Sequence, residues 1–268
     1  MLAAALLVPS LLYVRPYRIR GVGTSRANRE ALYFLGGVLA LWVATDWPLG
    51  ALGAGYLLTA HTLTYILLSL VAAPLLLLGS RAWLAERWRS RPAVGAVLRF
   101  LARPLPALAV FNVALIVTHL PDVVDDLARS QLGTFGVDMT WLVSGMVLWW
   151  PVVAPTPEVS RLSRPLKMGY LFLATLVPTI PAAFLTFATY PVYALYELAP
   201  RVFEIPAATD QQVAGLTMKL IGDLPLWLAF GLQFFWWARE EEQTGPAPPP
   251  APSVELRVGT ADRSVAPT

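Results

Sequence analysis

The basic residues of this chain gather in alternate gaps between its hydrophobic stretches, a pattern that leaves few possible folds. Of the 20 Lys and Arg residues, five lie in the first gap, six in the third and three in the fifth. The second gap has none, and the fourth and sixth have one each. Because short loops rich in Lys and Arg remain in the cytoplasm, the alternation predicts seven membrane-spanning helices, with the N-terminus outside and the C-terminus in the cytoplasm. The three basic gaps contain Arg15, Arg18, Arg20, Arg26, Arg29, Arg81, Arg87, Arg89, Arg91, Arg99, Arg103, Arg161, Arg164 and Lys167.

The composition favours an all-α polytopic membrane protein. Hydrophobic residues make up 56% of the chain, charged residues 14%, and the mean hydropathy is +0.58. A soluble domain of this composition would expose too much apolar surface. The net charge is +3, but the basic residues lie at predicted membrane edges, where they set orientation and meet lipid head groups, so nucleic-acid binding is not expected. The absence of cysteine excludes disulfides and thiolate metal sites.

The predicted membrane domain covers residues 1–239, and a Pro-rich cytoplasmic tail, residues 240–268, is predicted to be disordered. The first span is short for a bilayer. A cleaved signal peptide is the alternative there, but no basic stretch precedes the apolar run. Between Arg81 and Arg103, Arg residues alternate with Trp, Leu and Phe, which fits either amphipathic helices in the cytoplasmic interface or a solvated loop. The predicted spans are residues 1–14, 31–45, 56–78, 105–120, 138–153, 168–190 and 213–238.

Polar residues inside the predicted spans mark a candidate site, because lipid penalises them unless they have a partner or a function. The sequence has two histidines, and His61 and His119 lie near the outer ends of the third and fourth spans, at similar depth. Tyr65 follows His61 by one helical turn on the same face. Asp138 and Met139 are predicted to open the fifth span from the same side. These residue types are metal ligands, so the five residues form a candidate metal site.

An acidic loop adjoins this site in the predicted topology. The outer loop between the fourth and fifth spans carries Asp122, Asp125 and Asp126, with Arg129 as its single basic residue. An acidic mouth of this kind would attract a cation that arrives from outside.

Each candidate residue also has a structural interpretation. A histidine within the membrane can be an interhelical hydrogen-bonding residue. Asp138 can be a first-turn carboxylate favoured by the helix dipole, and Met139 and Met218 can be packing residues. In the last span Lys219 and Asp223 are four residues apart, which favours an intrahelical ion pair over a proton relay.

Several strings of residues together resemble a known family. The strings are His61-Thr62-Leu63-Thr64-Tyr65, Val71-Ala72-Ala73-Pro74, His119-Leu120-Pro121, Gly145 with Trp149-Trp150-Pro151, and Asp210-Gln211-Gln212 with Gly215 and Met218. In this order and spacing the chain resembles the CtaG-like cytochrome c oxidase assembly factors, and the likeness runs from about residue 7 to residue 242.

The resemblance implies a seven-span protein of the bacterial plasma membrane that assists assembly of the haem-copper oxidase by handling copper at the outer face, with an oxidase subunit as its partner. His61 and His119 match family histidines. The resemblance places a second histidine where this chain has Tyr65, and a further pair at Thr134 and Asp138, so the chain has two of five expected imidazoles. The signature of the final span adds candidate pocket or client contacts, namely Asp210, Gln211, Gln212 and Met218.

Three functional hypotheses follow. The first is an assembly factor or metallochaperone in which His61 and His119, with Asp138 or Met139, hold copper transiently. The second is a metal-free scaffold for an oxidase subunit, favoured by the missing imidazoles. The third is a haem-binding membrane protein with the two histidines as axial ligands. No enzymatic activity is expected, because the glycines form no phosphate-binding loop and no Ser, His and Asp set can be placed together.

Overall fold

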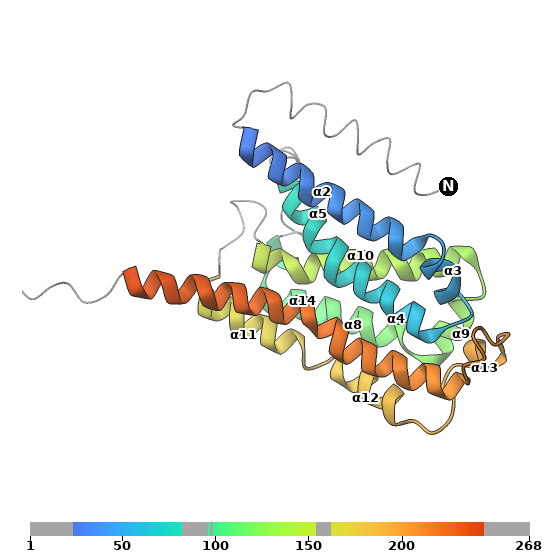
Figure 1. Cartoon of the computed structure of the whole chain (residues 1–268). Helices are drawn as coiled ribbons and strands as arrows, with labels where there is room; N and C mark the ends of the chain where they lie inside the picture. The colour runs from blue at the N-terminus through green and yellow to red at the C-terminus, as the bar shows by residue number, and fades with distance from the viewer. Residues whose placement is uncertain (1–23, 82–95, 97–98, 154–161, 244–268) are drawn as a thin grey trace, which may run out of the picture.

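The computed structural model describes residues 24–81, 96, 99–153 and 162–243, and within these ranges it contains helices and no strand. The helices run back and forth along one direction (Figure 1). The short helices α3 (Leu49–Gly53), α9 (Pro121–Leu127) and α13 (Ala194–Leu198) gather at one end of the bundle. We call this the acidic end, after Asp46, Asp122, Asp125, Asp126 and Glu197, and the opposite end the basic end, after Arg81, Arg103, Arg164 and Lys167.

The first layer of the bundle is a pair of long helical columns. α2 (Thr24–Thr45) packs along a column made of α4 (Leu58–Ile66), the π-helix η1 (Leu67–Ala72) and α5 (Ala73–Gly79). Pro74 lies in the first turn of α5 and has no N–H. The hydrogen bond from residue 74 to the carbonyl of residue 70 is therefore missing, which accounts for the widening of the helix into η1.

The remaining helices pack against this column and against each other. α10 (Gln131–Val153) contacts α8 (Pro104–Thr118) as well as η1 and α5. α14 (Ala207–Gln243) runs along α4 and along both α11 (Arg164–Ala174) and α12 (Thr179–Phe187). Small residues allow close approach, since a Cβ on Gly145 would lie 2.4 Å from the Ser69 carbonyl oxygen and one on Gly215 would lie 2.6 Å from that of Ala182.

Candidate membrane-spanning helices are present, although the described residues do not confirm seven. Four helices are long and apolar enough to cross a membrane, and they cover 58–79, 131–153, 164–187 and 207–243. The pair α8 and α9, bent by 71°, would make a fifth. α2 has 22 residues but is not among them, because polar residues such as Arg29 and Glu30 lower the hydropathy of its first turns. The predicted first span, most of the segment between Arg81 and Arg103, and the tail beyond Gln243 lie outside the described residues.

Several helices extend beyond the predicted spans. The helix that contains the predicted second span begins at Thr24, before residue 31, and the one that contains the fifth begins at Gln131, before Asp138. The sixth is broken into α11 and α12 around Pro178, which cannot donate the next hydrogen bond of a helix. The last span extends at both ends, from Ala207 to Gln243, so the first residues of the predicted tail are helical.

At the basic end, basic side chains from two of the predicted cytoplasmic gaps bind the C-terminus of α10. The Arg81 guanidinium donates to the carbonyl of Val153 at 3.0 Å, and the Lys167 ammonium donates to that of Val152 at 2.9 Å. Both cations therefore satisfy carbonyls that the C-terminus of α10 leaves without a partner. That this end faces the cytoplasm is a prediction of the charge pattern.

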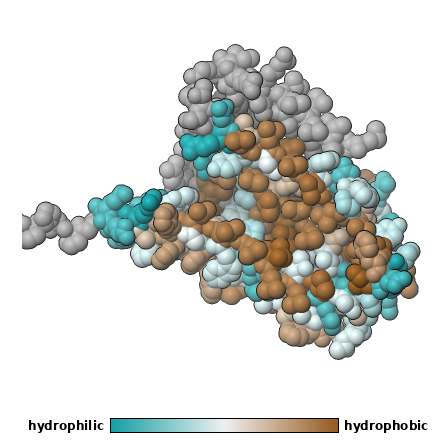
Figure 2. All heavy atoms as spheres, in the orientation of Figure 1, coloured by the Kyte–Doolittle hydropathy of each residue, from teal (hydrophilic) through white to brown (hydrophobic). Residues whose placement is uncertain are grey.

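Apolar side chains cover the outside of the bundle as well as filling it. Figure 2 shows hydrophobic residues across the middle of the molecule and hydrophilic residues toward its ends. Exposed apolar residues on the long helices include Leu32, Leu39, Leu105, Val143, Ile180, Leu220 and Leu228. Such a surface needs lipid rather than water around it.

Candidate functional site

The two histidines come together near the acidic end of the bundle. His61 lies in the first turn of α4, and His119 follows α8 at the bend into α9. Their ring centres are 6.4 Å apart, and the ring planes are inclined by 68°. The similar depth predicted from the sequence thus corresponds to a shared cluster.

Each imidazole has one ring nitrogen without a hydrogen-bond partner among the described residues. His119 Nδ1 lies 2.8 Å from the Leu115 carbonyl oxygen. Because a carbonyl can only accept, Nδ1 carries the proton in the neutral ring and Nε2 keeps a free lone pair. The Nε2 atoms of His61 and His119 are both buried and unpaired. Buried polar atoms are normally hydrogen-bonded, so this pair is available to a ligand or to water.

Trp141 of α10 joins the two histidines to Tyr65. Its ring centre lies 4.8 Å from that of His61, 6.0 Å from that of His119 and 5.5 Å from that of Tyr65. The Trp141 indole N–H donates to the Thr118 hydroxyl at 2.9 Å. The Tyr65 hydroxyl, by contrast, is buried and has no hydrogen-bond partner in the described part of the chain. Trp141 is therefore fixed in place, while three polar atoms around it remain available.

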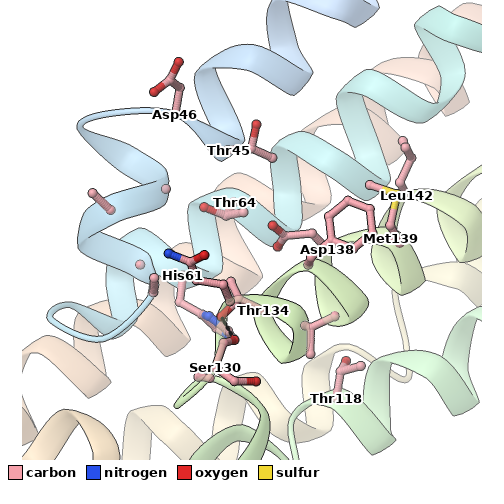
Figure 3. Close-up of a pocket in the computed structure, with 18 of the residues that line it drawn as sticks. Thr45, Asp46, His61, Thr64, Thr118, Ser130, Thr134, Asp138, Met139 and Leu142 are labelled. Atoms are coloured by element: carbon pink, nitrogen blue, oxygen red, sulfur yellow. Dashed lines mark hydrogen bonds between the residues drawn. The ribbon is translucent and has the colours of Figure 1, made fainter. Parts of the chain in front are cut away.

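A cavity of about 770 Å³ opens beside this cluster, between α2, α3, α4 and α10 (Figure 3). His61, Asp138 and Met139 line the cavity, whereas Tyr65 and His119 do not. At the acidic end its lining includes the exposed residues Asp46 and Arg129. The wall also contains four threonines, Thr45, Thr64, Thr118 and Thr134. Of the five predicted metal ligands, His61, Asp138 and Met139 therefore line the cavity, whereas His61, His119 and Tyr65 surround Trp141. His61 belongs to both groups.

Asp138 does not open a span as predicted, because α10 begins seven residues earlier, at Gln131. The first-turn interpretation of this carboxylate is therefore wrong, since the helix dipole acts within the first turn. Asp138 instead lies two turns inside α10 and faces the cavity (Figure 3). No hydrogen bond or ion pair joins it to the described residues.

The acidic loop is not the open rim that the sequence predicts. Residues 121–127 form α9, and the Asp125 carboxylate accepts hydrogen bonds from the backbone N–H groups of Ala194 at 3.1 Å and Leu195 at 2.9 Å. Asp126 lies 3.8 Å from Arg129 in an exposed ion pair. Asp125 therefore caps the N-terminus of α13, a role that sequence spacing could not show because the partners are about 70 residues away.

Two tyrosines of the α13 segment close the cluster and were missed from the sequence. The Tyr193 hydroxyl donates to the His119 carbonyl at 2.9 Å, and the Tyr196 hydroxyl donates to the Gly53 carbonyl at 2.6 Å. Burial raises the pKa of both phenols, so both remain donors. The Tyr196 ring lies 5.9 Å from that of His61.

The Asp210 signature holds the acidic end together. The Asp210 carboxylate accepts from the backbone N–H groups of Leu58 at 2.6 Å and Thr59 at 3.3 Å, which ties α14 to the start of α4. The Gln211 amide accepts from the Val192 N–H at 2.7 Å and donates to the Tyr190 carbonyl at 3.1 Å. Gln212 donates to the Ala188 carbonyl at 3.5 Å, and Met218 is buried in the main core. None of the four lines the cavity.

The Lys219–Asp223 ion pair predicted from the spacing is present. The Lys219 ammonium lies 2.7 Å from the Asp223 carboxylate. It also donates to the Thr179 hydroxyl at 2.7 Å and to the Thr175 carbonyl at 3.4 Å, at the break between α11 and α12. Lys219 therefore adds a second hydrogen bond to the Thr175 carbonyl, which already accepts from the Thr179 hydroxyl at 2.9 Å across this break.

The unpaired atoms near the acidic end can hold an ion of low coordination number. Among the described residues, no three His, Asp or Glu side chains are close enough to bind a metal together. A structural zinc ion takes four ligands. Imidazole suits borderline ions such as zinc and copper, a thioether favours soft ions, and oxygen donors favour harder ones. The geometry therefore offers a two-imidazole site behind a cavity that contains one carboxylate and one thioether.

Comparison with known proteins agrees with the resemblance found in the sequence. The sequence model of the family described as cytochrome c oxidase caa3 assembly factor (Caa3_CtaG) matches residues 11–240. No curated protein and no solved structure matches the chain. The matched range contains the histidine cluster, the cavity and the described helices except the last three residues of α14. The protein is therefore a membrane-embedded member of the cytochrome c oxidase caa3 assembly factor family.

Proposed function

We propose that this protein assists oxidase assembly as a metallochaperone, by holding Cu(I) between His61 and His119 and delivering it to an oxidase subunit at the outer face of the bacterial plasma membrane. Family membership supplies the oxidase as client, and an assembly role is in keeping with a non-catalytic protein. The copper step is supported by this chain's own histidines. Copper here is cargo that the protein binds and releases.

The distance between the two imidazoles is the observation that carries the proposal. With a metal–nitrogen distance of about 2.0 Å, two imidazoles on opposite sides of one ion have ring centres about 6.3 Å apart. The observed separation is 6.4 Å. The Leu115 carbonyl fixes the tautomer of His119 that presents Nε2 as a ligand.

Binding of Cu(I) to the purified protein tests this proposal. A chromophoric Cu(I) chelator would compete with the protein under anaerobic conditions, so that the dissociation constant and stoichiometry can be measured. We expect one tightly bound ion per chain and an affinity at least about tenfold weaker in His61→Ala/His119→Ala. His119→Asn is a matched variant that keeps a donor for the Leu115 carbonyl while it removes the ligand nitrogen. Equal affinity of wild type and double variant would contradict the proposal.

A metal-free scaffold is the second candidate function, and the missing imidazoles favour it. Tyr65 stands where the family resemblance places a histidine, and the described residues hold no three-ligand group. A scaffold would restore oxidase assembly without its histidines and would bind no copper in the titration.

A haem site is less well supported by the packing. A porphyrin between the imidazoles would have to displace Trp141, whose ring centre lies within 6.0 Å of both histidine rings. Absorbance of the purified protein distinguishes this alternative, because bis-histidine haem gives a Soret band.

A further inference from the structure

One short segment of the chain, at α13, contacts both histidines of the proposed copper pair. Tyr193, the residue before α13, donates its hydroxyl to the backbone carbonyl of His119 at 2.9 Å. Tyr196, three residues later, has its ring centre 5.9 Å from that of His61. His61 belongs to α4 and His119 follows α8. The α13 segment therefore joins two ligands that come from different helices.

The Tyr196 side chain is fixed where it meets His61. It is buried, and its hydroxyl donates to the Gly53 carbonyl at 2.6 Å. Its ring also packs edge-on against that of Tyr193, with ring centres 6.2 Å apart and planes inclined by 80°, which is a favourable aromatic arrangement. The His61 ring thus lies between two buried aromatic rings, since the ring of Trp141 is 4.8 Å from it. Tyr196 limits how far the His61 ring can move.

The position of His119 depends on two hydrogen bonds, one to its ring and one to its backbone. The ring Nδ1 lies 2.8 Å from the Leu115 carbonyl oxygen. The His119 backbone lies at the bend of 71° between α8 and α9. Carbonyl groups at the C-terminus of a helix have no partner within it, and the Tyr193 hydroxyl supplies a donor to this one. Tyr193 therefore holds the bend that carries the second imidazole.

Side chains of other helices hold the α13 segment in turn. The Asp125 carboxylate of α9 accepts from the backbone N–H groups of Ala194 at 3.1 Å and Leu195 at 2.9 Å. The Gln211 amide of α14 accepts from the N–H of Val192 at 2.7 Å. Loss of the Asp125 contacts would therefore loosen α13 while both tyrosines stay intact.

The two tyrosines pack apart from the main core. They belong to a small buried cluster at the acidic end, whereas Trp141 belongs to the main core. Separate clusters of this kind occur beneath long connecting segments. The other buried members of the small cluster are Leu58, Val124, Leu185 and Ala214. A shift of α13 can thus reach the histidines without rearrangement of the main core.

Resting on the proposed function, we propose that α13 is a clamp on the histidine pair, in which Tyr193 and Tyr196 are positioning residues that keep the two imidazoles at the separation one Cu(I) ion needs. The tyrosine hydroxyls are not ligands, because each already donates to a carbonyl. With the clamp in place, both imidazoles hold the ion. When the clamp loosens, one imidazole moves away and the ion is released faster.

The imidazoles can be observed without any metal, because the chain has two histidines. Histidine labelled with ¹⁵N in the ring gives one set of NMR signals for each residue in the detergent-solubilised protein. We expect Tyr193→Phe/Tyr196→Phe to shift or broaden the signals of both rings. Tyr190→Phe changes an exposed tyrosine of the same loop and should leave them as in wild type. Identical ring signals in wild type and the double tyrosine variant would overturn the clamp.

Cu(I) binding and release test what the clamp does for the ion. Transfer of Cu(I) to a chromophoric chelator gives the dissociation constant and the release rate. We expect both to rise about tenfold in Tyr193→Phe/Tyr196→Phe, as for other residues that orient metal ligands, and to stay within about twofold of wild type in Tyr190→Phe. Wild type that binds no Cu(I) would overturn the proposed function. Full retention of wild-type binding and release in the double tyrosine variant would overturn the clamp alone.

A variant outside the tyrosines separates the clamp from a general loss of stability. Asp125→Ala removes the cap of α13 and should speed release a few-fold. Asp126→Ala, at the neighbouring exposed aspartate that pairs with Arg129, is the matched control and should release Cu(I) as wild type does. Thermal unfolding is measured for each variant. Equal release by Asp125→Ala and Asp126→Ala, or variants that unfold earlier while their release rates stay at the wild-type value, would contradict the clamp.

Discussion

Two of the polar clusters in the described bundle differ in whether their atoms are paired. In the Lys219–Asp223 cluster the ammonium meets a carboxylate, a hydroxyl and a carbonyl. In the histidine cluster the Nε2 atoms of His61 and His119 and the Tyr65 hydroxyl are buried without partners. Among the described residues, the Lys219 ammonium therefore has three partners, whereas the three polar atoms of the histidine cluster have none.

This difference separates a structural role from a functional one. A paired charge cluster stabilises a broken helix, because losing one member leaves the other unpaired in a medium of low dielectric. An unpaired cluster adds little stability and keeps its lone pairs available for a ligand. Substitutions in the first should therefore affect folding, and substitutions in the second should affect binding.

The largest effect on stability is expected at the paired cluster. Lys219→Met should lower the free energy of unfolding by about 3 kcal/mol, because Asp223 loses its counter-charge and Thr179 loses a donor. Lys219→Met/Asp223→Leu should recover at least half of that loss, since no charge is then left unpaired. Unfolding in detergent measures both variants, and a single variant as stable as wild type would remove the contrast between the clusters.

Trp141 is the buried tryptophan at the centre of the histidine cluster. Its substitution should cause the second-largest loss of stability. Trp141→Phe removes the hydrogen bond to Thr118 and part of a fully buried side chain. We expect the free energy of unfolding to fall by about 2 kcal/mol. Trp227→Phe, on the exposed side of α14, is the matched control and should change it by less than about 0.5 kcal/mol. Similar losses in both would mean that Trp141 does not support the cluster.

The α13 segment should make a smaller contribution. Tyr196→Phe removes the donor to the Gly53 carbonyl and should cost about 1 kcal/mol, because that carbonyl is left with one contact fewer. Tyr190→Phe, at an exposed tyrosine, should be neutral. Hydrogen exchange of residues 193–198 would follow the effect locally, and unchanged protection in Tyr196→Phe would contradict a closing role for this tyrosine.

The smallest effect on stability is expected at the unpaired histidine itself. His61→Leu should change the free energy of unfolding by less than about 1 kcal/mol in either direction, because the Nε2 atom that it removes is buried and has no hydrogen-bond partner among the described residues. The same variant should lose tight Cu(I) binding. A loss of stability as large as that of Lys219→Met would show that His61 is structural, and the two clusters would then no longer differ in kind.

The sequence revealed polar residues within apolar spans but not the contacts that complete each cluster. The two histidines and the Lys219–Asp223 spacing are visible because lipid makes such residues exceptional. Trp141 gives no such signal, because tryptophan is common in membrane spans. Its role depends on contacts with α4, with the end of α8 and with the bend into α9. Asp125 and Tyr196 form hydrogen bonds with backbone groups far away in the chain. No local spacing of residues in the sequence predicts such contacts. The start of α10 was misplaced because Thr134 and Gly136 interrupt its apolar run.

Cytochrome c oxidase activity in membranes of a deletion strain is the most direct test of the copper pair. The strain would carry the wild-type chain, His61→Ala/His119→Ala, or Asp46→Asn as a matched control, with the amount of each protein in the membrane measured alongside. We predict that wild type and Asp46→Asn restore activity, and that the double histidine variant does not although it accumulates to the same level. Equal restoration by the double variant would contradict the proposal that His61 and His119 hold copper for the oxidase.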